Sequence, residues 1–426
     1  MKTVCVLTTF NSYDASYSLN LVAEDQIKML LIGGYKPILI VNEGFEPKGA
    51  YADERVEIEK VFKATASNDG ILPSTWKDEV KKLEVAYQEI FEKHKVDVVI
   101  THDLISQPAA LVNNMAGREV AKKMPKISWK NFVHSVFSSN VESNILEVSK
   151  AGRMPWPNSN LVFPNSYDRS RLARNFNVEE PTVLTVPHPT DVLSFFDFEN
   201  PLRKIIEDKN VLDKEVVLVY PCRLDNGKQP HVIIEIAAAL KRLGTSVCAI
   251  IVDFASTGGA KVDYRNSMKD LAVERGLNDE EAFFLSEQDP VYKYSGTKKT
   301  ISNLFSISNV FVLPSKSETY SLVAQESALC GNFMILNFDF PVMREIYGSE
   351  HPKFFKFSSN IDINTGMDGA TNTEYSDPLA YYEDIARYVK FTVRNDRVLA
   401  MKTKIRRERN LAAVFRNYFE PMLYSD

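Results

Sequence analysis

The feature that most constrains the fold is a predicted strand, tight loop and helix within residues 310–331. Residues 310–313 form an apolar run typical of a short buried strand, and residues 322–330 have the pattern of a helix. Glu318 falls in the loop and Glu326 about two helical turns later, so both carboxylates can face one cleft. The start of the helix would direct free N–H groups at that cleft, which favours a phosphate-bearing ligand. An ordinary α/β crossover with solvated acids is the alternative interpretation.

The same alternation of apolar runs and helical segments recurs along the chain. Residues 4–8 and 37–41 read as strands on either side of a helix over 20–32, and this arrangement places the first loop at the carboxyl edge of a parallel sheet. A charged stretch, 197–214, precedes a second alternation that begins at residue 215. We therefore expect an α/β protein with two Rossmann-like domains facing across a cleft. They comprise residues 1–196 and 197–392, and a C-terminal helix of about 393–426 is expected to pack back on the first.

Composition excludes several classes of protein. A length of 426 residues suits two domains, and 44% hydrophobic with 25% charged residues is ordinary for a soluble protein. No apolar run approaches the roughly 18 residues that span a bilayer, and residues 1–9 lack a signal-peptide core, so a cytoplasmic location is expected. The four cysteines are far apart without zinc-ligand spacing, which favours reduced core thiols. The sequence does not indicate an oligomeric state.

Two cations stand in the loop after the first strand of the second domain. Arg223 and Lys228 flank Gly227, and such a pair can grip a diphosphate, the arginine as a fork and the lysine as a point charge. Solvated loop cations are the alternative. No G-x-G-x-x-G follows either domain's first strand, which disfavours an NAD enzyme.

These motifs resemble a known family. R-L-x-x-x-K at 223–228, followed by P-S-x-x-E-x-x-x-L-V-x-x-E-x-x-x-x-G at 314–331, is similar to the retaining GT-B glycosyltransferases of family four, most strongly over 215–348. The resemblance implies that Arg223 and Lys228 hold the diphosphate of a nucleotide sugar, Glu318 the sugar hydroxyls and Glu326 the ribose. His134, in F-V-H-S at a strand end, looks like the family's first-domain histidine beside the transferred sugar.

From this resemblance we expect a retaining hexosyl- or pentosyltransferase with a UDP-linked donor and no metal or further cofactor. The expected catalytic residues are His134 and Glu318. The expected donor-binding residues are Arg223, Lys228, Glu318, Thr319, Tyr320, Ser321, Leu322 and Glu326. Cations fixed at the leaving diphosphate would stabilise its developing charge. A nucleotide-sugar epimerase or phosphorylase, or a non-catalytic sugar-nucleotide sensor, stays open.

The acceptor is less constrained. The first loop, residues 10–17, lacks the family's usual glycine pair and offers Asn11, Ser12 and Tyr13 on the acceptor side. Residues 118–174 and 386–426 each hold ten Lys/Arg against four Asp/Glu. The aromatic residues available for stacking or packing are Trp129, Phe132, Phe137 and Trp156. A shared basic face would suit DNA, as in phage enzymes that glycosylate 5-hydroxymethylpyrimidines. A lipid or cell-surface glycan acceptor is the alternative.

Overall fold

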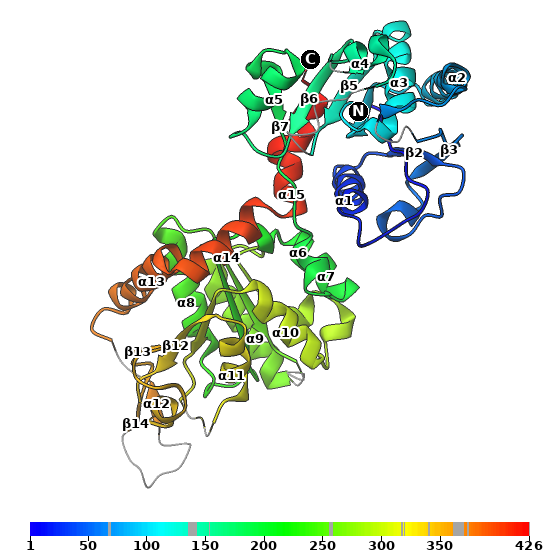
Figure 1. Ribbon diagram of the computed structural model, residues 1–426. Helices are drawn as coiled ribbons and strands as arrows, with labels where there is room; N and C mark the ends of the chain where they lie inside the picture. The colour runs from blue at the N-terminus through cyan, green and yellow to red at the C-terminus, as the bar shows by residue number, and fades with distance from the viewer. Residues whose placement is uncertain are drawn as a thin grey trace. The chain divides into compact units, whose positions relative to one another are not determined.

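The chain divides into two units, each built around a parallel β-sheet (Figure 1). The computed structural model describes residues 1–66, 70–134, 143–152, 154–254, 259–316, 318, 320–339, 341–360, 370–372 and 375–425. One unit contains Met1–Asp191 together with Leu411–Asp426, and the other contains Val192–Asn410.

The sheet of the first unit has the strand order β3-β2-β1-β4-β5-β6-β7. Its strands are β1 (Val4–Leu7), β2 (Ile38–Asn42), β3 (Glu57–Val61), β4 (Val98–His102), β5 (Ser128–Phe132), β6 (Ser159–Phe163) and β7 (Leu184–Thr185). All the strand pairs in this sheet are parallel. The order reverses direction between β1 and β4, the position where doubly wound sheets bind ligands.

Helices cover both faces of this sheet. They are α1 (Ser18–Ile32), α2 (Trp76–His94), α3 (Leu111–Lys123), α4 (Leu146–Gly152) and α5 (Arg169–Phe176). Successive residues of β1 alternate between two cores: Cys5 and Leu7 pack with α2 and α3, whereas Val4 and Val6 pack with α1. This alternation follows from the period of two in a strand, and burial on both faces explains why the strand is a continuous apolar run.

The C-terminal segment completes the α1 side of the first unit. It consists of α15 (Leu411–Val414), a π-helical turn (Phe415–Phe419) and α16 (Glu420–Leu423). Phe415 is 5% exposed and its ring packs so closely on Gly33 that a Cβ at Gly33 would lie 2.2 Å from it. Lys2 Nζ donates to the Leu423 carbonyl at 2.8 Å, which ties the segment to the N-terminal strand.

The second unit has the order β10-β9-β8-β11-β12-β13, again parallel with a reversal beside its first strand. Its strands are β8 (Val216–Pro221), β9 (Val247–Val252), β10 (Ala282–Phe284), β11 (Val310–Leu313), β12 (Phe333–Asn337) and β13 (Lys353–Phe355). Its helices are α6 (Val192–Phe195), α7 (Asn200–Asp208), α8 (Pro230–Arg242), α9 (Gly259–Glu274), α10 (Lys298–Ile307), α11 (Leu322–Leu329), α12 (Pro341–Tyr347), α13 (Pro378–Asn395) and α14 (Arg397–Glu408). A short antiparallel pair joins β14 (Ser358–Asn360) to β15 (Ala370–Asn372).

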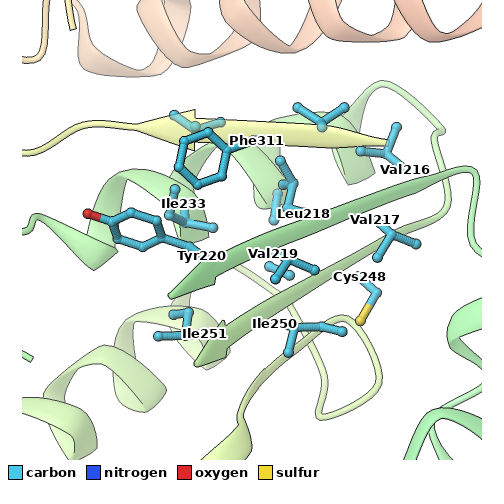
Figure 2. Packing of buried hydrophobic residues seen from close by; sticks show 14 of the residues in the cluster. Val216, Val217, Leu218, Val219, Tyr220, Ile233, Cys248, Ile250, Ile251 and Phe311 are labelled. Carbon is cyan, nitrogen blue, oxygen red and sulfur yellow. The ribbon is translucent and has the colours of Figure 1, made fainter. Parts of the chain in front are cut away.

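The core of the second unit is centred on β8, β9 and β11. Figure 2 shows Leu218, Tyr220 and Phe311 packed between the sheet and its helices. Burying each such side chain stabilises the fold by about 1.5–3 kcal/mol. This core holds the carboxyl ends of β8 and β11 side by side, which is where the candidate site lies.

Each unit by itself confirms the predicted parallel α/β domain, and the facing arrangement stays a prediction. The predicted domain boundaries need correction. The division falls before Val192 rather than after residue 196, because Val192 and Leu193 belong to the core of the second unit. The segment that returns to the first unit begins at Leu411, not near 393, because Val393 is buried in the second unit's core.

Candidate functional site

A cavity of about 560 Å³ lies at the carboxyl edge of the second sheet, at the reversal between β8 and β11. Its walls come from the loops after these strands and from the start of α11. The lining residues are Tyr220, Pro221, Cys222, Arg223, Lys228, Val252, Phe254, Leu313, Glu318, Tyr320, Ser321, Leu322 and Val323. The structure therefore brings together six predicted donor-site residues: Arg223, Lys228, Glu318, Tyr320, Ser321 and Leu322.

A lysine and a carboxylate meet in this cavity. Lys228 Nζ forms an ion pair with Glu318 Oε1, and the two side chains are 21% and 15% exposed. Arg223 is exposed and, within the described part of the chain, forms no ion pair. The cavity thus holds one cation that is already paired and one that is available to an anion.

A buried amide fixes the lysine loop beside the glutamate loop. Gln229 has a left-handed φ of 50° and is 2% exposed. Its Nε2 donates to the carbonyls of Pro314 at 2.5 Å and Phe357 at 3.0 Å. Tyr220 Oη donates to the Lys228 carbonyl at 2.7 Å. A left-handed conformation costs a non-glycine residue about 1–2 kcal/mol, and these hydrogen bonds offset that cost.

The start of α11 closes the cavity. Ser321 precedes the helix with a φ of 61°, and its side chain does not cap the first turn. The N–H groups of that turn can therefore serve an anion. Glu326 is half-buried on α11 but is not among the described side chains that line the cavity, so its predicted ribose contact stays a prediction. The predicted Thr319 lies outside the described residues.

In the first unit, His134 lies within a stack of three histidines. It follows β5, His102 ends β4 and His188 follows β7. The centroid of the His134 ring lies 5.3 Å from that of His102, with 13° between the ring planes. It lies 5.3 Å from the centroid of His188, with 19° between the planes. The backbone N–H of His134 donates to Asp103 Oδ1 at 2.9 Å. These residues meet at the carboxyl edge because parallel strands all end there.

Burial keeps all three imidazoles neutral near pH 7. It lowers the pKa of His102 well below its ordinary value, and the neighbouring histidines lower it further. Burial also lowers the pKa of His134, against a smaller opposing effect of Asp103. Burial and then His134 lower the pKa of His188 to about 4. A neutral imidazole has one donor and one acceptor nitrogen, so each ring can both give and receive a hydrogen bond.

The predicted acceptor-side residues are held by neighbours in the first unit. Asn11 Oδ1 accepts a hydrogen bond from Asn42 Nδ2 at 2.8 Å. Tyr13 Oη donates to Glu24 Oε2 at 3.0 Å. Burial raises the pKa of Tyr13, and the hydrogen bond to Glu24 raises it further. Ser12 is exposed. Nothing in the described part of the chain tests an acceptor role for these three residues.

Most of the second basic segment expected beside a DNA acceptor belongs to the second unit. Nine of the ten Lys/Arg in residues 386–426 precede Leu411 and therefore belong to the second unit. Several are occupied by structural contacts: Arg394 pairs with Glu215, and Arg406, which is 3% exposed, donates to the Val211 and Leu212 carbonyls.

The aromatic residues proposed for stacking also have another role. Trp129, Phe132 and Trp156 are 0%, 1% and 2% exposed, so they are core residues, and Phe137 lies outside the described part. These three side chains therefore pack in the core rather than stack on a ligand, and the DNA acceptor stays a prediction.

One group in the described part has the spacing of metal ligands. Glu57, Glu59 and His94 place ligand atoms within 4.8 Å of one another. Lys93 Nζ also contacts Glu59 Oε1 at 2.6 Å, so this carboxylate already has a cationic partner. No helix among the described residues has the length and apolar character that a membrane span requires.

Sequence reasoning missed several residues of the two sites. Phe254 and Cys222 line the second unit's cavity. His102 and His188 lie beside His134, and Gln26 contacts His102. The strand-end position of His102 was a usable signal. The Pro187-His188-Pro189 segment gave no signal that His188 lies beside His134, because that contact joins segments that are distant in the sequence.

Both units are doubly wound α/β folds, and the second has a cation–carboxylate cavity at its strand reversal, where folds of this class bind ligands. Comparison with known proteins narrows this class. Residues 203–364 match the family described as Glycosyl transferases group 1. This segment lies within the second unit and includes both Lys228 and Glu318.

A D-inositol 3-phosphate glycosyltransferase from Saccharomonospora viridis is 31% identical over 175 residues, which cover 40% of this chain and 38% of that protein. The chain thus matches less than half the length of this relative. These matches show that the second unit contains a segment similar to a glycosyl transferases group 1 domain.

Solved structures of similar layout have low overall scores. A glycosyltransferase from Rickettsia africae ESF-5 has a TM-score of 0.37 at 15% identity, with both chains covered completely. Anabaena Alr3699/HepE, solved with UDP and glucose, has a TM-score of 0.35 at 13% identity, also over both whole chains. The fold assignment accordingly rests on the strand order of each unit.

Proposed function

We propose that this protein is a glycosyltransferase that moves a sugar from a nucleotide-sugar donor, UDP-linked, to an acceptor hydroxyl. The observation that carries the proposal is the meeting of Arg223, Lys228 and Glu318 at the strand reversal of the second unit. Cleavage of a sugar–diphosphate bond leaves negative charge on the phosphate. Two cations and a helix start supply positive potential for that charge without a metal ion.

Glu318 is suited to a different part of the donor. An ionised carboxylate only accepts hydrogen bonds, so it fits sugar hydroxyls rather than phosphate oxygens. In the structure, the Glu318 carboxylate forms an ion pair with Lys228. We infer that the diphosphate takes over Lys228 when donor binds, which releases Glu318 to the sugar.

The proposal includes retention of the configuration at the anomeric carbon, which the family resemblance implies. It requires the acceptor oxygen to attack on the face that the diphosphate leaves. A nucleotide-sugar epimerase or phosphorylase could use the same cation pair, and product analysis separates these activities, because only a transferase links the sugar to a non-phosphate acceptor.

The acceptor is to be found by experiment. Duplex DNA with 5-hydroxymethylcytosine or 5-hydroxymethyluracil stays in the test set, together with lipid-linked and glycan acceptors. Sugar transfer to DNA that weakens steeply with salt would support the DNA prediction. Donor hydrolysis without DNA labelling across several donors would exclude it.

The donor site is tested with Lys228→Met, which removes the charge and keeps much of the side-chain length. Bound UDP-glucose should raise the melting temperature of the native protein, because a ligand stabilises the state it binds. Loss of one charge-stabilising group should lower kcat about 10²–10³-fold. Lys299→Met is the matched control, since Lys299 is a half-exposed lysine of the same unit whose one ion pair within the described residues is with Asp197 at the surface. Near-normal turnover in Lys228→Met and Arg223→Met would refute the diphosphate assignment.

A further inference from the structure

The histidine stack of the first unit contains a hydrogen-bond chain that the proposed donor chemistry does not use. His102 Nδ1 lies 3.0 Å from His134 Nε2, and His102 Nε2 lies 3.1 Å from Gln26 Oε1. Gln26 comes from α1 and is 2% exposed, and His102 is 4% exposed. The chain therefore runs from a buried amide through a buried imidazole to His134.

The direction of this chain follows from donor and acceptor rules. Two neutral imidazole nitrogens at hydrogen-bond distance must be one N–H and one lone pair. An amide oxygen can only accept, so the Gln26 oxygen requires a proton on His102 Nε2. The other nitrogen of His102, Nδ1, then carries a lone pair and accepts from His134 Nε2–H. His134 is left with its lone pair on Nδ1.

The main chain of His134 is fixed as well. Asp103 has a left-handed φ of 53° and accepts the backbone N–H of His134. Ser106 Oγ donates to the same Asp103 oxygen at 3.2 Å. The His102 ring lies nearly coplanar with the His134 ring, at 13°, and the hydrogen bond between their edges restricts rotation of the His134 imidazole.

We propose that Gln26 and His102 are positioning residues which hold His134 as the tautomer protonated on Nε2, so that its Nδ1 is a hydrogen-bond acceptor for a ligand hydroxyl. The role of the tautomer in turnover rests on the proposed glycosyltransferase function. The tautomer itself does not, because it is set in the ligand-free protein. Which nitrogen of a histidine carries the proton is commonly set by the partner of the other nitrogen.

The test measures the tautomer directly by ¹⁵N NMR of the histidine side chains in the full chain. We expect a protonated Nε2 and an unprotonated Nδ1 on His134 at pH 7.5. Gln26→Glu is the discriminating variant: an ionised carboxylate only accepts, so it should preserve this tautomer. Gln26→Leu removes the acceptor and should shift His134 toward a mixture of tautomers. His231→Gln is the control: His231 belongs to the second unit, so its replacement should remove one histidine signal and leave the His134 tautomer unchanged.

The same variants are assayed for turnover with the best donor. Partners that orient a functional histidine are typically worth about 10–100-fold in activity, so Gln26→Leu should lower kcat at least tenfold with little change in donor KM, whereas Gln26→Glu should retain more activity. His102→Phe keeps a flat ring in the stack and should resemble Gln26→Leu. Melting temperatures confirm that each variant is folded.

The proposal is overturned if wild-type His134 is protonated on Nδ1, or if Gln26→Glu changes the tautomer while Gln26→Leu does not. It is also overturned if both substitutions leave the tautomer unchanged. If no donor is turned over, the proposed function fails, whereas the NMR result for the tautomer still decides this inference.

Discussion

Replacing Glu318 with glutamine should have opposite effects on the binding of free UDP and on sugar transfer. In the ligand-free protein Glu318 holds Lys228 in an ion pair whose side chains are only 15% and 21% exposed. A diphosphate must compete with this carboxylate for the lysine and is also repelled by it. Glu318→Gln removes both effects while keeping the shape of the side chain.

The expected magnitude follows from the burial of the pair. Two unit charges 4 Å apart attract by about 4 kcal/mol at an effective dielectric constant of 20, and exposed pairs contribute about 0.2–1 kcal/mol in practice. For this partly buried pair we take about 1 kcal/mol, which corresponds to about fivefold tighter UDP binding. Transfer from UDP-glucose should instead slow at least tenfold, because the variant loses a charged hydrogen bond to a sugar hydroxyl, worth about 1.5–3 kcal/mol.

Isothermal titration with UDP, together with a transfer assay, measures both effects. Glu281→Gln is the matched control, because Glu281 is a carboxylate of the same unit that pairs with Lys241, is 16% exposed and is not among the described residues that line the cavity. The gain in UDP affinity should shrink at high salt, since it is electrostatic. Weaker UDP binding in Glu318→Gln, or equal gains in both variants, would refute the competition between Glu318 and the diphosphate.

Two further predictions concern stability. Burial lowers the pKa of His188 from 6.5 to about 4 in the folded protein, which therefore favours the neutral imidazole. This preference contributes at most about 3 kcal/mol to the free energy of unfolding. The contribution is fully present above pH 6.5 and is lost as the pH falls toward 4. Urea titrations from pH 7.5 to 4 should show this loss, and it should be smaller in His188→Phe; identical pH profiles would contradict it. Phe415→Ala should destabilise the first unit by about 3–5 kcal/mol, because Phe415 is 5% exposed and packs on Gly33. Val398→Ala, at a side chain that is 70% exposed, is the control, and equal denaturation midpoints would contradict the packing role of Phe415.

Local sequence patterns predicted much of the fold. The helix predicted over residues 20–32 is observed as Ser18–Ile32, and Gly33 caps its end. The helix predicted over residues 322–330 is observed as Leu322–Leu329, with Cys330 as its C-cap. The edge strand Glu57–Val61 was not predicted, because its charged residues hide the pattern of a strand.

The candidate site was predicted in part for the same reason. Arg223, Lys228 and Glu318 stand in short motifs, so their loops were identifiable from the sequence. The ion pair between Lys228 and Glu318 joins residues 90 positions apart, and the contact between His102 and His134 joins residues 32 apart. Such pairings depend on strand order, which a single sequence does not display locally.

The division of the chain has a consequence for biosynthesis. The second unit is one continuous segment, Val192–Asn410, whereas the first needs Leu411–Asp426 to cover the α1 side of its sheet. During translation, therefore, the second unit can finish folding while the first still exposes the apolar surface that Phe415 and Phe419 will bury. About 220 residues are synthesised between the two parts of the first unit. At 5–20 residues per second, this takes about 10–45 seconds. Throughout that interval the first unit is a natural client for chaperones that shield apolar surface.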